Sequence, residues 1–323
     1  MKCISKFFAY IIISSMFLIP LTGCGKKELA LAYERTANIP TARAADQRTD
    51  TFASDICVVN GNITEGTDVA IEEQSAAGLF DVNKNEVIYA KNIHERLNPA
   101  SLTKVMTALV AIKYGNTEDT IVCTSNVKIE ESGATVCGLK EGDTLTLNQA
   151  LHALLITSAN DAAVAIAEHI GGSVEAFCEM MNKEAVALGA TNSHFMNPHG
   201  LTENEHYVTA YDMYLIMNSA MQYELFNQII HMNEYSTVYY SADGDEKEME
   251  FKSTNLYFRE DYSAPEKITV IGGKTGTTNA AGNCLILLTK DTSGNPYISV
   301  ILKASERGLM YQEMTDLLSE INN

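Results

Sequence analysis

Strand-like segments stand at both ends of the folding part of this chain, and helical segments fill its middle. Near the start, SAAGLFD and EVIYA flank the polar turn VNKN, which predicts a β-hairpin. The last third holds five further strand-like segments, YSTVYYS, EMEFK, ITVIGGKTG, CLILLTK and YISVILK, with TSGN as the turn between the last two. This order predicts one antiparallel sheet that is assembled from both ends of the chain.

The middle of the chain is predicted to be mainly helical. Asn98 as the cap and Pro99 at the first position begin a helix that runs to about Tyr114 and stops at Gly115. Apolar periodicity predicts four more helices and a closing amphipathic one: TLNQALHALLI, DAAVAIAEHI, VEAFCEMMNKEAVAL, TAYDMYLIMNSAM and SERGLMYQEMTDLLSEI. We therefore expect an α/β (α+β) fold with a helical subdomain at about 115–232, and a site in the cleft between that subdomain and the sheet.

The N-terminus has the pattern of an export signal. Lys2 and Lys6 precede the apolar run FFAYIIISSMFLIPLT, and Gly23 and Cys24 follow it. The run is shorter than the roughly 20 residues of a membrane span, although an uncleaved anchor helix is the alternative. Because LTGC resembles a bacterial lipobox, we expect a lipoprotein signal peptide at 1–23, lipid on Cys24, and an extracytoplasmic protein that this lipid anchors to the cell membrane.

A polar segment without sustained periodicity follows, rich in Thr, Ala, Asn, Asp and Gly. It predicts a flexible tether over 24–68, with a span on the order of 35 Å. The folded domain is expected to occupy 69–323.

Charge and cysteine content exclude several classes of protein. The formal net charge of −18 argues against a nucleic-acid partner, because phosphate binding needs clustered Lys and Arg. Beyond Cys3 and Cys24, five cysteines remain, widely spaced and without a C-x-x-C pair. A disulfide framework or a zinc site is therefore not expected, although a bond between Cys123 and Cys137 stays an open alternative.

Three short motifs carry residues that suit catalysis, and each is weak alone. S-x-x-K occurs at Ser101–Lys104 and again at Ser125–Lys128, where a polar context predicts a surface turn. S-x-N occurs three times, and only Ser158-Ala159-Asn160 lies between two apolar helices; there Asn160 as a simple helix cap is the alternative. Lys274-Thr275-Gly276 ends the predicted strand ITVIGG, which a Gly-rich turn would also explain.

Together the motifs are specific, because one of each stands in a suitable context and in the order helix start, interhelical junction, strand. This combination resembles serine penicillin-binding proteins and β-lactamases. The flanking segments NPASLTKVMTALV, LLITSANDAAVAIAEHIGG, LGATNSHFMNPHGLT, YVTAYDMYLIM and GGKTGTTNAAGNCLILLTK are similar to low-molecular-weight D-alanyl-D-alanine carboxypeptidases, peptidase family S11. The resemblance covers about residues 70–321. It implies a β-lactamase/transpeptidase-like fold with a five-stranded antiparallel sheet.

Two departures from the resembling proteins stand out. Many relatives continue into a small β-rich domain and a C-terminal anchor, whereas this chain stops about 45 residues after Gly276, so the lipid on Cys24 is expected to replace that anchor. The segment NPHGLTENEHYVTAYD lacks the Glu-x-x-x-Asn pattern that activates water in class A β-lactamases, although Glu203 and Glu205 are nearby carboxylates.

The residues themselves suggest how the first motif works. Residues three apart on a helix are neighbours, so Lys104 can reach the hydroxyl of Ser101. Burial, the charge of Lys274 and the helix N-terminus all lower the pKa of a lysine, which allows Lys104 to act as a general base. His199 is an alternative base, but a structural loop role is preferred because Lys104 already supplies one.

The resemblance implies the remaining roles. Ser101 attacks the carbonyl between the terminal D-Ala residues of a peptidoglycan stem peptide, and the backbone N–H groups of Ser101 and Thr277 bind the oxyanion. Ser158 with Lys274 relays a proton to the leaving amine. The substrate-binding residues are expected to be Asn160, Lys274, Thr275, Gly276 and Thr277. β-Lactams are expected inhibitors, and no metal or cofactor is needed.

Three rival functions use the same features. A β-lactamase or a D,D-endopeptidase would carry the same motifs, and a catalytically inactive wall-binding lipoprotein would carry the same anchor.

Overall fold

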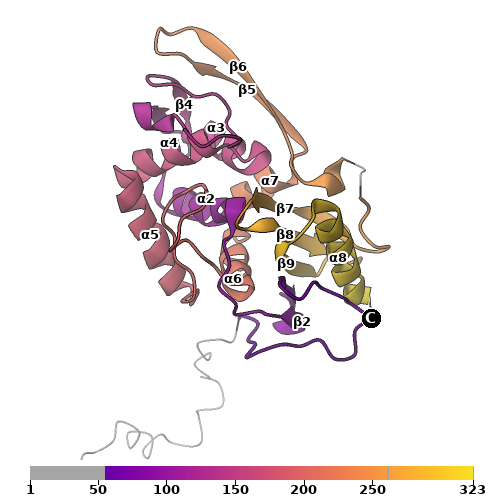
Figure 1. The fold of residues 1–323 in the computed structure, drawn as a ribbon. Helices are drawn as coiled ribbons and strands as arrows, with labels where there is room; N and C mark the ends of the chain where they lie inside the picture. The colour runs from indigo at the N-terminus through magenta and orange to yellow at the C-terminus, as the bar shows by residue number, and fades with distance from the viewer. Residues whose placement is uncertain (1–54, 260–261, 323) are drawn as a thin grey trace, which may run out of the picture. The chain divides into compact units, whose positions relative to one another are not determined.

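The main sheet of this computed structural model, which describes residues 55–259 and 262–322, joins the two ends of the domain (Figure 1). Its strand order is β2-β1-β9-β8-β7, and every neighbouring pair is antiparallel. The strands are β1 Ala76–Asp81, β2 Glu86–Lys91, β7 Thr269–Thr278, β8 Gly282–Lys290 and β9 Pro296–Ala304. The predicted hairpin at the start and the predicted five-stranded antiparallel sheet from both ends are confirmed.

Helices cover both faces of this sheet, which explains why β1, β8 and β9 are almost wholly buried. The closing helix α8, Arg307–Ser319, packs its Tyr311, Met314 and Leu317 in one core with Leu285 and Leu287 of β8. On the other face, α6 (Ala210–Ala220) stacks Tyr214 on Phe80 of β1, with ring centroids 4.1 Å apart. Such double burial gives strands that read as continuous apolar runs.

The helical middle is present with the predicted order. Its helices are α2 Thr103–Tyr114, α3 Leu147–His152, a π-helical turn at Ala153–Thr157, α4 Asn160–Gly171 and α5 Val174–Ala187. Gly115 ends α2, and the Ser173 hydroxyl caps α5 by accepting from the Ala176 N–H. One more helix, α7 Glu224–His231, was not predicted, because its two turns are too short to establish a period.

The start of α2 differs from the prediction. A 3₁₀ turn, Ala100–Leu102, precedes the helix, and Pro99 occupies its N-cap without a side-chain bond. The Asn98 side chain donates instead to the carbonyl of His206, 2.9 Å away. Ala100 has a φ of 47°, which sets the angle at which the chain enters the turn.

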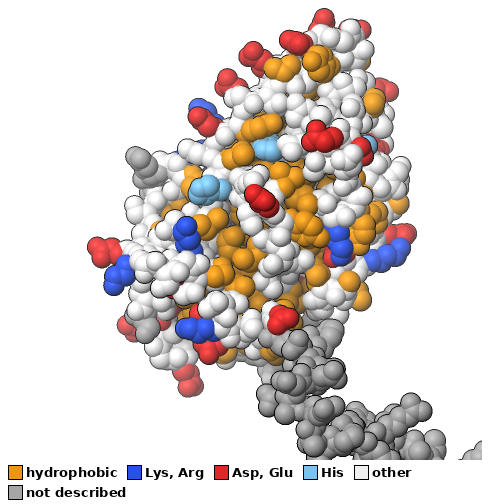
Figure 2. Space-filling view, turned by 180° about the vertical axis from the view of Figure 1, so that it is seen from behind, with side chains coloured by type: hydrophobic (Ala, Val, Ile, Leu, Met, Phe, Trp, Pro, Cys, Tyr) orange, Lys and Arg blue, Asp and Glu red, His pale blue; other side chains and the backbone are white. Residues whose placement is uncertain are grey.

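Two strands predicted for the main sheet form a second one. The strands β3 Thr120–Val122, β4 Thr144–Thr146, β5 Glu234–Tyr240 and β6 Glu246–Lys252 pair in the order β3-β4-β5-β6. In β6, Met249 and Phe251 are buried while Glu248 and Glu250 are exposed, the alternation of a half-buried strand. Figure 2 shows acidic side chains around this upper end of the molecule. Short 3₁₀ turns complete the described chain at Ser125–Val127, Leu256–Phe258 and Glu320–Asn322.

The structure describes the segment expected to be a tether only from residue 55, and residues 55–63 pack on the domain. The expected signal peptide at 1–23, the expected lipid site Cys24 and the expected tether as far as residue 54 lie outside the described residues. From there on, Cys57 is fully buried, and Ile63 exchanges two backbone hydrogen bonds with Ala90 of β2. Burial of apolar side chains and these hydrogen bonds hold residues 55–63 against the domain, although the polar composition predicts a free segment. Within residues 55–259 and 262–322, no helix has the length and apolar character to cross a membrane.

Two tyrosines of α6 fix the backbone of Cys57. The Cys57 N–H donates to the Tyr214 hydroxyl at 2.9 Å, and the Tyr211 hydroxyl donates to the Cys57 carbonyl at 2.8 Å. Replacing both tyrosines with Phe removes these bonds and keeps the rings, at a cost of about 1 kcal/mol each. Hydrogen exchange should therefore accelerate at residues 55–63, whereas Tyr240→Phe on an exposed side chain should change nothing. Unchanged protection at 55–63 in the double variant contradicts this anchoring.

Candidate active site

The amine of Lys104 joins three segments of the domain. From the first turn of α2, its Nζ lies 3.0 Å from the Ser101 hydroxyl, 2.6 Å from the Asn160 Oδ1 and 2.7 Å from the His199 carbonyl oxygen. The amide oxygen of Asn160 and the carbonyl of His199 can only accept hydrogen bonds, whereas a serine hydroxyl can donate or accept. A neutral Lys104 therefore gives its two protons to Asn160 and His199 and turns its lone pair to Ser101.

The surroundings of Lys104 favour that neutral form. Its side chain is 0% exposed, and burial is the main cause that holds its pKa well below the ordinary value. The charge of Lys274 lowers this pKa further, while the carboxylate of Asp161 opposes the shift. Burial and Lys274 are the causes that the sequence predicts.

The segment Lys274-Thr275-Gly276 runs along β7 beside the Ser101 turn. Lys274 is 1% exposed, its Nζ donates to the Thr275 carbonyl at 2.9 Å, and burial lowers its pKa to about 7. The Thr275 hydroxyl donates to the hydroxyl of Thr254 at 2.6 Å. A Cβ on Gly276 would lie 2.8 Å from the backbone nitrogen of Ser101, so only glycine lets the strand approach this closely.

Ser158-Ala159-Asn160 forms the break between the π-helical turn and α4. Ser158 is buried in the left-handed region with a φ of 69°, a strained backbone for a residue with a side chain. Ala159, not Asn160, is the N-cap of α4, so the alternative of Asn160 as a simple cap is wrong. The Asn160 side chain points to Lys104 instead.

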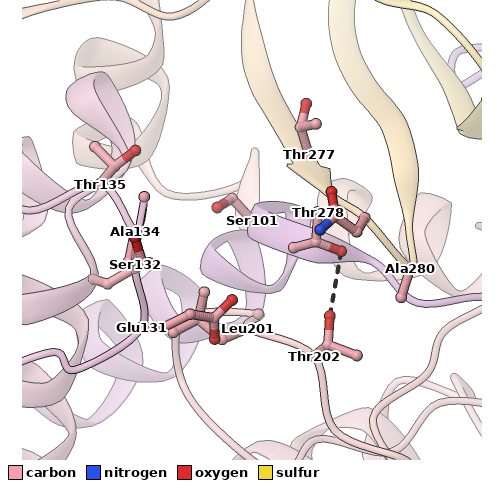
Figure 3. Close-up of a pocket in the computed structure, with 14 residues that line it drawn as sticks. Ser101, Glu131, Ser132, Ala134, Thr135, Leu201, Thr202, Thr277, Thr278 and Ala280 are labelled. Carbon is pink, nitrogen blue, oxygen red and sulfur yellow. Dashed lines mark hydrogen bonds between the residues drawn. The ribbon is translucent and has the colours of Figure 1, made fainter.

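A pocket of about 480 Å³ opens over Ser101 (Figure 3). Ser101, Asn160 and Thr277 line it, whereas Lys104, Ser158, Lys274, Thr275 and Gly276 lie outside its lining. Its walls are the loop Glu131–Thr135, the loop Gly200–Thr202 and the end of β7 with Asn279 and Ala280. The two latter walls meet where the Thr202 hydroxyl donates to the Thr278 hydroxyl at 3.4 Å.

The sequence did not reveal the wall at 131–135, nor the residues that hold this wall and the segment after it. The Asp161 carboxylate accepts from the backbone N–H groups of Cys137 at 3.0 Å, Gly138 at 2.8 Å and Leu139 at 3.0 Å. The Thr135 carbonyl accepts from the Asn160 N–H at 2.8 Å. The only sequence hint is a carboxylate directly after the S-x-N motif.

Two histidines, His199 and His206, hydrogen-bond to the segments around Ser101 and Lys104. The ring of His199 accepts from the Leu201 N–H, and burial together with Lys104 lowers its pKa to about 3. These contacts agree with the predicted loop role of His199. The Met196 N–H donates to His206 Nδ1, so Nε2 carries the proton and donates to Thr103 at 2.8 Å. Thr103 in turn donates to the carbonyl of Ala100.

The second S-x-x-K motif lies outside this site, and the described cysteines form no disulfide. Ser125–Lys128 forms a 3₁₀ turn, and exposed Lys128 pairs with Glu130 at 2.6 Å, so the predicted surface turn is confirmed. Cys123 and Cys137 are both free thiols, and so are the other cysteines of the described ranges. No group of metal-binding side chains occurs within those ranges.

Comparison with known proteins assigns this arrangement to a family. The D-alanyl-D-alanine carboxypeptidase family (Peptidase_S11) matches residues 63–306. The chain belongs to this family. The D-alanyl-D-alanine carboxypeptidase DacF of Bacillus subtilis is 35% identical over 252 residues, which cover 76% of this chain and 61% of DacF. DacC of Escherichia coli is 32% identical over 254 residues, with 75% and 59% covered. The chain thus spans about three fifths of the length of these family members.

Solved structures show the same fold. The DD-transpeptidase of Streptomyces K15 superposes with a TM-score of 0.71 and 25% identity, covering 80% of this chain and 98% of that one. A penicillin-binding protein homologue of Mycobacterium tuberculosis gives a TM-score of 0.70 and 26% identity, with 81% and 96% covered. The predicted fold class is confirmed.

The position of Asp161 predicts a measurable effect on Lys104. Asp161→Asn removes the negative charge that raises the pKa of Lys104, so this pKa should fall further. The Cε chemical shift of Lys104, followed against pH in protein with ¹³C-labelled lysine, reports it. The variant should also lose about 1–3 kcal/mol of stability, because three backbone N–H groups lose their charged acceptor.

Asp143→Asn is the matched control. Asp143 is also buried, accepts from the Lys140 N–H at 3.0 Å, and lies 3.5 Å from Lys247. It should lose stability without moving the Lys104 titration. Equal titration midpoints in wild type and Asp161→Asn refute the electrostatic link.

Proposed function

We propose that this protein is a serine D-Ala-D-Ala carboxypeptidase that removes the terminal D-Ala from peptidoglycan pentapeptide stems and so acts in cell wall synthesis and remodelling. The observation that carries this proposal is the Lys104 amine, held by two obligate acceptors with its third contact on Ser101. Family membership and the carboxypeptidase names of the matched proteins support the reaction type.

Acylation begins at Ser101. Neutral Lys104 takes the hydroxyl proton as Ser101 Oγ forms a bond to the carbonyl carbon between the two D-Ala residues. Because Asn160 and His199 already fix the other amine protons, the lone pair needs no reorientation. Burial keeps water from competing for Lys104.

The developing oxyanion is bound by the backbone N–H groups of Ser101 and Thr277. Gly276 brings β7 close to the Ser101 nitrogen, which allows both donors to face one oxygen. Loss of one such donor typically costs about 10²- to 10³-fold in rate.

The leaving amine receives a proton through Ser158 and Lys274 as the C–N bond breaks. Asn160 also holds the substrate amide, and Lys274 and Thr277 recognise the terminal carboxylate, as does Thr275 if it releases Thr254. Water then hydrolyses the ester and frees Ser101. This cycle needs no metal or cofactor, and a β-lactam arrests it by acylating Ser101.

Release of D-Ala from a pentapeptide ending in D-Ala-D-Ala tests the proposal. Wild type should release D-Ala, and Ser101→Ala should abolish both this release and covalent labelling by penicillin while the fold persists. Lys104→Ala should lower the acylation rate by at least about 10²-fold, the usual scale of general-base catalysis. Thr107→Ser, a conservative change one turn along α2, serves as the control for changes inside the helix.

The rivals give different results in the same assay. Rapid penicillin turnover without D-Ala release indicates a β-lactamase, and cleavage of cross-linked peptides alone indicates an endopeptidase. Absence of labelling at Ser101 in folded protein indicates an inactive wall-binding lipoprotein.

We also propose that the mature protein is a lipoprotein held at the outer side of the cell membrane through Cys24, with residues from there to 54 as the tether. The lipobox-like LTGC after a 16-residue apolar run supports this. Labelled palmitate should be incorporated into the wild type but not into Cys24→Ala, which should leave the membrane fraction. Equal incorporation in both proteins rejects the anchor, and Cys57→Ala at a buried thiol is the matched control.

A further inference from the structure

A buried chain of hydrogen bonds ends at the peptide bond before Ser101. His206 Nε2 lies 2.8 Å from the Thr103 hydroxyl, and this hydroxyl lies 2.8 Å from the carbonyl oxygen of Ala100. His206 is 1% exposed and Thr103 is 0% exposed, so water does not compete for these bonds. The chain thus connects a distant loop to the peptide bond between Ala100 and Ser101.

Each bond of this chain has a fixed direction. The backbone N–H of Met196 can only donate, and it donates to His206 Nδ1 at 3.2 Å, so the ring proton lies on Nε2. The carbonyl oxygen of Ala100 can only accept, so the Thr103 hydroxyl donates to it and accepts from His206. Burial and the charge of His194 lower the pKa of His206 to about 4, which keeps the ring neutral at neutral pH.

The peptide unit at the end of the chain carries a proposed oxyanion donor. In a planar trans peptide, the C=O of Ala100 and the N–H of Ser101 point in opposite directions, so bonds that fix the carbonyl also fix the N–H. The carbonyl oxygen accepts from both the N–H and the hydroxyl of Thr103, and Ala100 has a φ of 47°, a conformation that its surroundings must enforce. Donors on the carbonyl also polarise the peptide, which makes its N–H a stronger donor.

We propose that His206 is a positioning residue for acyl transfer, because through the Thr103 hydroxyl it holds the Ser101 N–H in the direction of the oxyanion. This inference rests on the proposed carboxypeptidase function, in which that N–H and the N–H of Thr277 bind the oxyanion. Ser101 lines the pocket, whereas His206 and Thr103 lie outside its lining (Figure 3). His206 thus acts on the backbone of Ser101, and Lys104 acts on its hydroxyl.

The alternative is a purely structural role, because His206 also supports its own loop. Its Nδ1 accepts from Met196, its carbonyl accepts from the Asn98 side chain at 2.9 Å, and its ring packs edge-on against Phe195. Two substitutions separate the roles. His206→Gln keeps a donor at the position of Nε2 and loses the acceptor for Met196, whereas His206→Asn keeps an acceptor near Nδ1 and is too short to reach Thr103.

The kinetics of these two variants test the proposal. With a pentapeptide ending in D-Ala-D-Ala, His206→Asn should lower kcat by about tenfold, the scale of one neutral hydrogen bond. KM should not change, because acylation and deacylation both pass through an oxyanion and the contact strengthens only there. Acylation by penicillin should slow by the same factor. His206→Gln should keep most of the wild-type rate, and the Cε titration of Lys104 should be equal in all three proteins.

Thr103 supplies an independent pair of variants. Thr103→Val removes the hydroxyl and should lower kcat about as much as His206→Asn, while Thr103→Ser should recover most of that loss. Because both residues act through one chain, the double variant His206→Asn/Thr103→Val should be no slower than either single variant. Thr289→Val is the matched control, because the buried hydroxyl of Thr289 has no hydrogen-bond partner among the described residues.

Several results overturn the role of His206 while D-Ala release by the wild type still supports the carboxypeptidase. These are a wild-type kcat in His206→Asn, equal losses in His206→Asn and His206→Gln, and a loss that lies in KM alone. If His206→Asn does not fold, the Thr103 pair decides by the same criterion. If the wild type releases no D-Ala, the proposed function is wrong and this inference falls with it.

Discussion

The hydrogen bonds of the Lys104 amine are the constraint on which the site depends. They tie the first turn of α2 to Asn160 of α4 and to the carbonyl of His199 in a distant loop. A buried ammonium without a carboxylate partner is costly, whereas a buried neutral amine with two acceptors is not. The packing around Lys104 therefore selects the chemical state that can remove a proton from Ser101.

Close backbone contact holds Ser101 in front of this amine, and that contact needs unusual residues. Ala100 and Ser158 both have positive φ values, and each stands next to or within one of the three motifs. A Cβ on Gly200 would lie 1.8 Å from the carbonyl oxygen of Ala100, so a glycine there lets the His199 loop lie directly under the turn. Such strain persists only where the surroundings determine the conformation, and here His206 and Thr103 hold the Ala100 carbonyl.

Sequence reasoning predicted the parts of the structure that depend on local pattern. Apolar periodicity located most helices and strands, and the i, i+3 spacing predicted the contact between Lys104 and Ser101. Sequence reasoning failed where contacts between distant segments determine the structure. The alternation of side chains identifies β5 as a strand but does not predict that β4 pairs with it. The polar composition around Cys57 likewise did not predict that two tyrosines hold this buried residue. Asp161 anchors residues 137–139, which follow the pocket wall at 131–135, through backbone N–H groups, and such groups carry no sequence signature.

The contacts of Asp161 also explain why Lys104 is not half of an ion pair. A carboxylate one residue after Asn160 would keep a lysine charged if it contacted the amine directly. Its oxygens instead accept from the backbone of 137–139 and of Ala162, and in the described ranges Lys104 forms no ion pair. The backbone N–H groups thus satisfy the carboxylate, and its charge reaches Lys104 only at a distance. The same bonds hold residues 137–139, which follow the pocket wall at 131–135. One aspartate thus both fixes the chain next to this wall and limits how far the pKa of Lys104 is lowered.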